Sequence, residues 1–254
     1  MNEMIKRQLN HRTIRFFKDR PVSEEQINTL MQVMNRTATS HSMQTASMIR
    51  VTDPDLKEKL AKIGKRDYIA NVPELWIFIV DVYRNSQIAK EKGYGGDNVR
   101  SMNYFVQGFT DACLMAQNVV NAAEAMDLGT VYFGCILNDV KQLINLLGLP
   151  KLTMPVVGLG FGEMDDHPDL KPRMPLEMKV YENTYERKEN YLSELTEYDE
   201  IMTHYYDTRQ HNQRSDTFTD QVLRNYSTPN ELRAKYFEIA KIQGFDVLGE
   251  LGEF

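Results

Sequence analysis

The stretch LWIFIV, residues 75–80, places six apolar side chains in succession with no polar residue between them. Strands with one face in water alternate apolar and polar residues, so this run predicts a strand that is buried on both faces. Further strands are expected at residues 130–134 (TVYFG) and 154–162 (MPVVGLGFG), with an extended piece at Ser47–Val51. So few strands make a small sheet, and helices have to cover it.

Helical patterns occupy most of the chain between these strands. A capping box of Ser23 and Gln26 predicts the start of one helix, and Asp53 followed by Pro54 predicts another, which stops at Gly64. Other helices are expected at residues 3–9, from about 99 to 127 with Gly129 as the stop, and at 139–147. Few strands separated by long helices predict the α+β class.

The chain changes in character after Gly162. A loop rich in proline and charge is followed by polar helix without a further strong strand. We expect residues 1–254 to form a single domain, in which residues 163–254 are a loop and a helical C-terminal extension. Because this extension has no apolar run of its own, it is expected to wrap a partner subunit.

Composition narrows the protein class. Hydrophobic residues make up 42% of the chain and charged residues 26%, which is ordinary for a globular protein. The net charge of −6 argues against a protein that grips nucleic acid. Cys113 and Cys135 lie in apolar stretches, so we interpret both as core residues, in keeping with a reducing compartment. No apolar run is long enough to span a bilayer, so a soluble cytoplasmic protein without a membrane partner is expected.

Several common sites have no motif in this sequence. No P-loop occurs, and GLGFGE, residues 158–163, is not followed by the helix that a Rossmann pyrophosphate site requires. The five histidines lie far apart without metal-ligand spacing, so no metal is expected. A G-x-S-x-G elbow is missing as well. Hydrolase and metalloenzyme interpretations therefore have little support.

Basic residues gather at three places: His11-Arg12-x-x-Arg15, Lys171–Arg173 and Thr208–Arg214. Each of them taken alone is consistent with a solvated turn or helix face. In LKPRMP, however, two prolines bracket Arg173 and stiffen the backbone, which suits charge-assisted hydrogen bonding to a phosphate. Together the clusters predict an anion site for a phosphorylated cofactor.

Five motifs, in order along the chain, resemble those of a known family. His11–Phe17 (HRTIRFF) resembles the opening pattern H-R-S-I-R-x-F of flavin-dependent nitroreductases of the NADPH-preferring, oxygen-insensitive group, which includes NADPH–flavin oxidoreductases. Ser40–Gln44 resembles the family's S-S-x-x-Q stretch, and Ala116–Asp139 its A-A-x-A-A-E-S-L-G-L-G-x-x-Y-I-G-G-I-R-N run. Lys171–Pro175 resembles K-P-R-L-P, and Tyr205–Gln221 resembles the Y-Y-x-x-R…R-x-x-T-W-S-D tail. The resemblance spans essentially the whole chain.

The resemblance implies an α+β nitroreductase-like fold, with a small, mostly antiparallel central sheet and a helical C-terminal extension that wraps a dimer partner. It implies a homodimer with FMN at the interface. It also implies a ping-pong cycle in which NADPH gives a hydride to FMN, and FMN passes it to a small-molecule acceptor such as a nitroaromatic, a quinone or a flavin. FMN itself is then the redox centre, and no side chain is expected to act as an essential acid or base.

The resemblance also implies roles for the matched positions in cofactor binding. Arg15 matches a position at the pyrimidine edge of the flavin, where a cation stabilises the negative charge of the reduced ring. A backbone N–H near Gly134 is expected to face the flavin N5. The phosphate contacts are expected from His11, Arg12, Thr13, Lys171 and Arg173, and the remaining flavin contacts from Ser40, Gln44, Arg66, Tyr132, Phe133, Gly134 and Cys135.

Arg209 and Arg214 match the family's arginines that grip the phosphates of NADPH. NADH lacks the 2′-phosphate, so two fixed cations favour NADPH. The alternative is a polar helix end in which these arginines pair with Asp207 and Asp216.

Three departures from the family pattern affect the ring and the acceptor. Arg66 stands where the family often has a flavin-contacting Gln, and it would raise the flavin potential if it reaches the ring. Cys135 replaces a glycine, so a backbone with positive φ would be costly there. His41 and Ser42, in the expected substrate pocket, replace residues that commonly line it, which leaves the acceptor open.

Two other classes of function compete with the enzyme. An FMN carrier or redox sensor with little turnover is favoured by the altered positions Arg66 and Cys135, and opposed by the retained Arg209 and Arg214. A helical interaction protein with basic surface spots would not explain five motifs in order.

Overall fold

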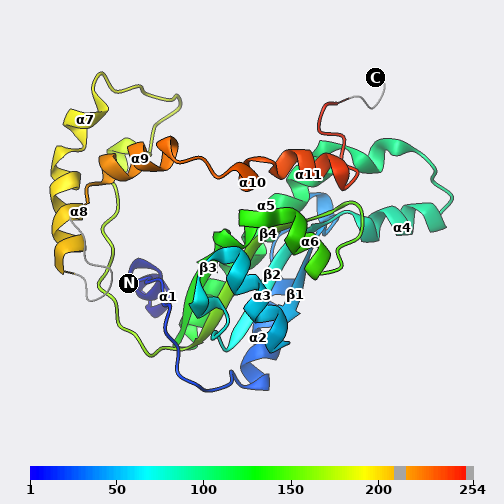
Figure 1. The fold of residues 1–254 in the computed structure, drawn as a ribbon, viewed down its shortest axis with the longest axis horizontal. Coiled ribbons are helices and arrows are strands. Elements are labelled where there is room, and N and C mark those ends of the chain that lie inside the picture. Colours follow the sequence, from blue (N-terminus) through cyan, green and yellow to red (C-terminus); the bar gives the residue numbers. More distant parts are fainter. Residues whose placement is uncertain (209–215, 250–254) are drawn as a thin grey trace. The chain divides into compact units, whose positions relative to one another are not determined.

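The computed structural model describes residues 1–208 and 216–249, which form two compact units. The first unit comprises Met1–His167 together with the segment that starts at Asn230, and the second comprises Pro168–Pro229. The strands belong to the first unit, whereas the second is made of helices and connecting loops (Figure 1). The assignment of all 254 residues to a single domain stays a prediction.

A four-stranded antiparallel sheet lies at the centre of the first unit (Figure 1). Its strands are β1 (Ala46–Val51), β2 (Glu74–Asp81), β3 (Leu128–Phe133) and β4 (Thr153–Glu163), in the spatial order β1-β2-β4-β3. β2 pairs with both β1 and β4 and is buried from Glu74 to Val80, which confirms the prediction for residues 75–80. A small sheet surrounded by helices confirms the α+β class.

Helices of the first unit cover this sheet. The longest described helix, α5, packs against β2, β3 and β4, and its buried positions include the small residues Ala112, Ala116 and Ala123. Among the helices that the structure describes, none is both long and apolar enough to cross a membrane. The helices of this unit are α1 (Glu3–Leu9), α2 (Glu24–Asn35), α3 (Pro54–Gly64), α4 (Tyr83–Glu91), α5 (Met102–Ala125), α6 (Val140–Leu146), α10 (Glu231–Ala234) and α11 (Tyr236–Ile242), with short 3-10 helices η1 (Ser40–Ser42), η2 (Asp67–Ile69), η3 (Asp97–Arg100) and η4 (Gly134–Asp139).

The end of α3 is where the sequence predicted it, whereas the end of α5 is not. α3 ends at Gly64, but the residue that takes the left-handed conformation there is Lys65, with φ of 51°. The residue that turns the chain after α5 is Asp127, with φ of 62°. The prediction that Gly129 stops α5 is wrong, because Gly129 lies inside β3. Both glycines are needed for close packing and not for a positive φ.

The two cysteines are free, and they differ in burial. Cys113 is exposed on α5, so the prediction that it packs in the core is wrong. Helical periodicity places Ala112 and Ala116 against the sheet and leaves Cys113 and Leu114 on the outer face. Cys135 is half-buried in η4.

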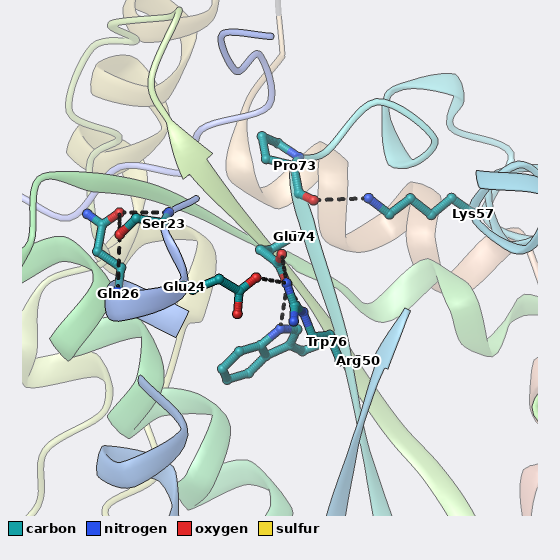
Figure 2. Close-up of polar contacts among 8 residues, drawn as sticks. All are labelled: Ser23, Glu24, Gln26, Arg50, Lys57, Pro73, Glu74 and Trp76. Atoms are coloured by element: carbon teal, nitrogen blue, oxygen red, sulfur yellow. Dashed lines mark hydrogen bonds and ion pairs between the residues drawn. The ribbon is translucent and has the colours of Figure 1, made fainter. Parts of the chain in front are cut away.

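A buried ion pair anchors the start of β2 to its neighbours (Figure 2). The Glu74 carboxylate accepts two hydrogen bonds from Arg50, of 2.8 Å from Nε and 2.7 Å from Nη2. Trp76 Nε1 donates to the same carboxylate at 3.0 Å. Arg50 also forms an ion pair with Glu24 at 3.7 Å. The only charged side chain in the buried part of β2 therefore has three donors from groups beside it.

Lys57 ties α3 to the turn before β2. Its Nζ donates to the carbonyl oxygens of Val72 at 2.8 Å and Pro73 at 3.0 Å (Figure 2 shows the latter). Burial lowers the pKa of Lys57, and the nearby Glu74 carboxylate works in the opposite direction.

The second unit has a small core of its own, made of Leu195, Tyr198, Met202 and Tyr206. Its helices are α7 (Tyr191–Glu194), α8 (Thr196–Thr208) and α9 (Phe218–Ser227), with the 3-10 helix η5 (Leu176–Met178). Asp199 on α8 accepts hydrogen bonds from the backbone N–H groups of Phe218 and Thr219, which fixes the start of α9. No strand occurs in the described part of this unit, as the sequence predicted.

Replacing Arg50 with Met tests the buried ion pair. Glu74 would remain buried without its cation, so we expect the free energy of unfolding in urea to fall by about 3 kcal/mol. Lys59→Met, an equivalent change at an exposed position of α3, is the control and should change it by less than about 0.5 kcal/mol. Equal effects of the two changes would contradict the stabilising role of the pair.

Candidate functional site

The cationic segment at residues 11–15 runs along β3, an edge strand of the sheet. Thr13 forms an isolated parallel bridge with Thr130, and the Ile14 N–H donates to the Thr130 carbonyl at 2.9 Å. Ile14 is 2% exposed, so its side chain fills the core. Successive side chains of an extended chain point to opposite sides, which turns Thr13 and Arg15 outward. Sheet pairing and one buried side chain thus fix this segment without a helix.

Gly129 permits this close approach. A Cβ at Gly129 would lie 2.8 Å from Ile14 Cβ and 2.6 Å from Met164 Cγ. Real Cβ atoms do not occupy such positions, so any side chain here would push residues 13–15 away from β3.

His11 is held by a carboxylate of α5. Its Nδ1 lies 2.6 Å from Glu124 Oε1, and the Thr130 hydroxyl donates to the same oxygen at 2.8 Å. With Nδ1 engaged by Glu124, the ring orientation is set and Nε2 is left for another partner.

The two arginines of the segment differ in their contacts. Arg12 donates from Nη1 to the Asn10 carbonyl at 3.1 Å. Arg15 is exposed and makes no hydrogen bond or ion pair with any residue in the described ranges. A guanidinium without an internal partner is available to an anion.

The Ser40–Gln44 loop has an unusual backbone. His41, Ser42 and Gln44 take positive φ values of 49°, 57° and 51°. Each non-glycine residue in this region costs on the order of 1 kcal/mol, so the surroundings have to hold the loop. His41, Ser42 and Gln44 are exposed, and Ser40 is half-buried.

Three side chains hold that loop from neighbouring helices. Asp111 of α5 is completely buried, and its Oδ1 accepts the Ser40 N–H at 2.9 Å. Asn85 of α4 donates to the Met43 carbonyl at 2.7 Å, and Arg84 donates to the Gln44 carbonyl. The predicted contacts Ser40 and Gln44 are therefore positioned through their backbones.

The end of β3 leads into η4 through the predicted flavin-contacting residues. Tyr132 is 37% exposed, its hydroxyl donates to Gln117 at 3.3 Å, and burial of the ring raises its pKa. Phe133 is buried, and its ring occupies the space beside Gly160, where a Cβ would lie 2.6 Å from it. Phe133 can therefore meet a ligand only through its backbone.

Two arginines flank the half-buried Cys135. Burial raises the pKa of its thiol, while the charges of Arg66 and Arg233 act to lower it. Arg233 Nη2 would lie 3.7 Å from a Cβ at Gly134, and Arg66 is exposed with Nη1 donating to the Lys65 carbonyl. Cys135 is not among the residues with positive φ, so the predicted backbone cost does not arise.

The second unit carries the other predicted cations. Lys171 Nζ lies 5.7 Å from the centroid of the Tyr206 ring, and Arg173 Nη1 donates to the Lys171 carbonyl at 3.1 Å. The Tyr198 hydroxyl of α8 donates to the Pro172 carbonyl at 3.4 Å. This bond holds the segment that carries Lys171 and Arg173 against α8. Arg209 and Arg214 lie outside the described residues.

Family models match both parts of the chain. The model of the nitroreductase family matches residues 9–163, and the model of the nitroreductase family C-terminal domain matches residues 171–247. This chain belongs to the nitroreductase family. The resemblance found in the sequence motifs is thereby confirmed, as is the nitroreductase-like fold.

Relatives and solved structures agree with this assignment. The chain is 37% identical over 231 residues to an oxygen-insensitive NADPH nitroreductase of Salmonella typhimurium, covering 91% of this chain and 93% of that protein. It is 34% identical over 226 residues to an FMN reductase (NADPH) of Bacillus subtilis, covering 88% and 91%. The structure of NADPH:FMN oxidoreductase from Vibrio harveyi complexed with NAD+ has a TM-score of 0.84 at 30% identity, covering 96% of this chain and 99% of that one.

Three residues that contact predicted site residues were missed by sequence reasoning: Asp111, Glu124 and Arg233. Asp111 and Glu124 are single acidic residues in the small-residue face of α5, and an isolated charge in such a face is a signal for a buried partner. Arg233 follows the N-cap Asn230 of α10, a start signal that the sequence does contain. Its place near Gly134 could not be read from the sequence, because about a hundred residues separate them.

Replacing Gly129 with Ala tests how the cationic segment is positioned. The added methyl group should displace residues 13–15 and weaken FMN retention about tenfold or more, measured by fluorescence of flavin released on dialysis. Gly95→Ala is the matched control, because Gly95 has no atom within 4 Å of an added Cβ. Unchanged retention in Gly129→Ala would show that the segment does not contribute to flavin binding.

Proposed function

We propose that this protein is an NADPH-dependent, FMN-containing oxidoreductase that acts as a homodimer on nitroaromatic, quinone or flavin acceptors. The enzyme class and both cofactors match the names of its relatives in the nitroreductase family. In this chain, Arg15 gives the proposal its main support. Its guanidinium is exposed and has no partner among the described residues, and the burial of Ile14 holds it at the edge of β3. Bound FMN would supply hydride transfer, taking a hydride from NADPH and giving it to the acceptor in a ping-pong cycle.

The phosphate of FMN is assigned first to residues 11–13. Arg12 and the outward Thr13 offer donors beside the Nε2 of His11, and Glu124 holds the His11 ring in place. Lys171 and Arg173 stay phosphate contacts that the family motif K-P-R-L-P predicts. Several donors of this kind suit a group that carries two negative charges.

The flavin ring is assigned to the end of β3 and the Ser40–Gln44 loop. Gly134 has no side chain, so a ring can approach its backbone N–H closely. Ser40 and Gln44 would bind the ribityl chain or ring, with Tyr132, Cys135 and the backbone of Phe133 beside it. Arg15 would stabilise negative charge on the pyrimidine edge of the reduced ring. We assign no side chain as an acid or base.

In this proposal Arg66 contacts the flavin ring at the position where the family often has a Gln. Its guanidinium is exposed and bonded only to the backbone beside it among the described residues, so it is free to turn to a ring. The charges of Arg66 and Arg233 near Cys135 make this side of the site cationic, which would raise the flavin potential.

NADPH and the acceptor are assigned to the remaining predicted residues. Arg209 and Arg214 would bind the phosphates of NADPH, and His41 and Ser42 would line the acceptor pocket. Both of the latter are exposed on the loop that also carries Ser40.

The outer face of α5 supports a homodimer with FMN at its interface. Val106, Phe109 and Leu114 are 58%, 37% and 46% exposed there. Apolar side chains gathered on one face of a long helix mark an interaction surface. We further propose that residues 163–254 belong to the same domain and wrap the partner subunit.

The visible absorption spectrum of the purified protein tests the function. We expect a yellow protein whose flavin absorbance is bleached rapidly by NADPH and slowly by NADH under anaerobic conditions. Bleaching by neither nucleotide would favour the FMN carrier or redox sensor. A colourless protein that cannot be reconstituted with FMN would reject the proposal.

Two arginine variants separate the assigned roles. Arg15→Ala should slow flavin reduction at saturating NADPH about tenfold or more, because the charge of the reduced ring loses its partner. Arg209→Ala should raise the KM for NADPH about tenfold with little change in kcat. Arg36→Ala, at the exposed end of α2, is the control and should alter neither. If both site variants matched the control, the residue assignments would be wrong even with the enzyme class intact.

A further inference from the structure

Arg233 lies beside Gly134, the residue whose backbone N–H we assign to the flavin. Arg233 Nη2 would lie 3.7 Å from a Cβ at Gly134. Asn230, at the start of α10, donates from Nδ2 to Asn138 Oδ1 of η4 at 3.1 Å, and its own Oδ1 accepts the Arg233 N–H at 3.1 Å. One asparagine therefore joins α10 to η4 and fixes the helical turn that carries Arg233.

The guanidinium of Arg233 has no internal partner. It is exposed and makes no hydrogen bond or ion pair with any described residue. Arg66, the second arginine that flanks Cys135, donates only to the Lys65 carbonyl, at 2.9 Å, within the described ranges. Burial raises the pKa of the Cys135 thiol, and the charges of both arginines oppose that rise, so both act on the same place. Two cations without a carboxylate partner give this side of the site a positive potential.

The acidic residues that neighbour these arginines in the sequence do not pair with them. Asp139 of η4 uses its carboxylate at the start of α6, where it accepts the Gln142 N–H at 2.9 Å. Asp67 and Glu231 are exposed, and neither forms an ion pair with the two arginines in the part of the chain that the structure describes. This side of the site therefore favours a negatively charged group.

The phosphates of the two cofactors already have assigned partners elsewhere. The FMN phosphate is assigned to residues 11–13 and to the K-P-R-L-P motif, and the NADPH phosphates are assigned to Arg209 and Arg214. In a ping-pong cycle the nucleotide leaves before the acceptor enters. An acceptor is then the molecule left to meet the cations beside Gly134.

We propose that Arg233, aided by the charge of Arg66, binds an anionic group of the electron acceptor, so that the enzyme prefers planar acceptors that carry a carboxylate or a similar anion. This inference rests on the proposed function and narrows its acceptors to those with a negative group. Arg233 contacts the acceptor and takes no part in hydride transfer. A hydrogen bond to a charged group strengthens binding about tenfold.

The kinetic test compares 4-nitrobenzoate with 4-nitrobenzamide, which has nearly the same shape and no charge. The ratio of kcat/KM for the benzoate to kcat/KM for the benzamide should fall about tenfold in Arg233→Gln and further in Arg233→Glu. Lys235→Gln removes the same charge at the residue that follows α10, and should keep this ratio within about twofold of wild type. The KM for NADPH in Arg233→Gln should stay within about threefold of wild type.

Binding without turnover is followed by fluorine NMR, with 4-fluorobenzoate and 4-fluorobenzamide titrated into the purified protein in the absence of NADPH. Wild type should bind the benzoate about tenfold more tightly than the benzamide, and Arg233→Gln should bind the two within about threefold of each other. An increase in salt from about 0.05 M to about 0.5 M should narrow the preference of the wild type, because the exposed guanidinium is screened.

An unchanged preference for the benzoate in Arg233→Gln, in either measurement, overturns the proposal. An equal loss of preference in Lys235→Gln also overturns it, since net charge and not position would then decide. A rise in the KM for NADPH as large as the loss of preference does the same, because Arg233 would then hold the nucleotide. Bleaching by NADPH is recorded in parallel: its absence with the expected NMR preference would reject the proposed function alone, and bleaching without that preference would reject the acceptor site alone.

Discussion

Burial of both faces of β2 is the constraint on which the rest of this structure depends. A strand that water does not reach cannot carry free polar groups, because each would lose hydration without compensation. The one carboxylate in its buried part, Glu74, is matched by Arg50 and Trp76 for that reason. Groups that bind charged ligands are consequently confined to the borders of the sheet and to the loops that leave it.

The edge of β3 is one such border, and the cationic segment at residues 11–15 lies along it. Pairing of Thr13 and Ile14 with Thr130 covers part of this edge and at the same time holds the cationic segment beside the first half of β3. Edge strands otherwise expose unpaired backbone groups that invite association with other chains. One interaction therefore protects the sheet and positions the residues that we assign to the cofactor. Gly129 makes the pairing possible, because Ile14 occupies the space that a side chain would take.

The Ser40–Gln44 loop also lies outside the buried part of the sheet, but hydrogen bonds from neighbouring helices, not strand pairing, hold it in place. Its left-handed residues are unfavourable by themselves, so its conformation is imposed by α4 and by Asp111 of α5. Strained backbone held by a rigid scaffold is common at functional sites, since it keeps ligand-binding groups in place before the ligand arrives.

The sequence by itself determined the α+β class, the buried strand, the starts of α1, α2, α3 and α6, and the family, because these depend on local patterns of apolar residues, caps and ordered motifs. Tertiary structure decided what local patterns do not contain. The sequence could not place Asp111 against Ser40, Glu124 against His11 or Arg233 near Gly134, since each pair joins segments that are distant along the chain. It misjudged Gly129 and Cys113 for a related reason: whether a small residue stops a helix, admits a neighbour or faces outward depends on what packs against it.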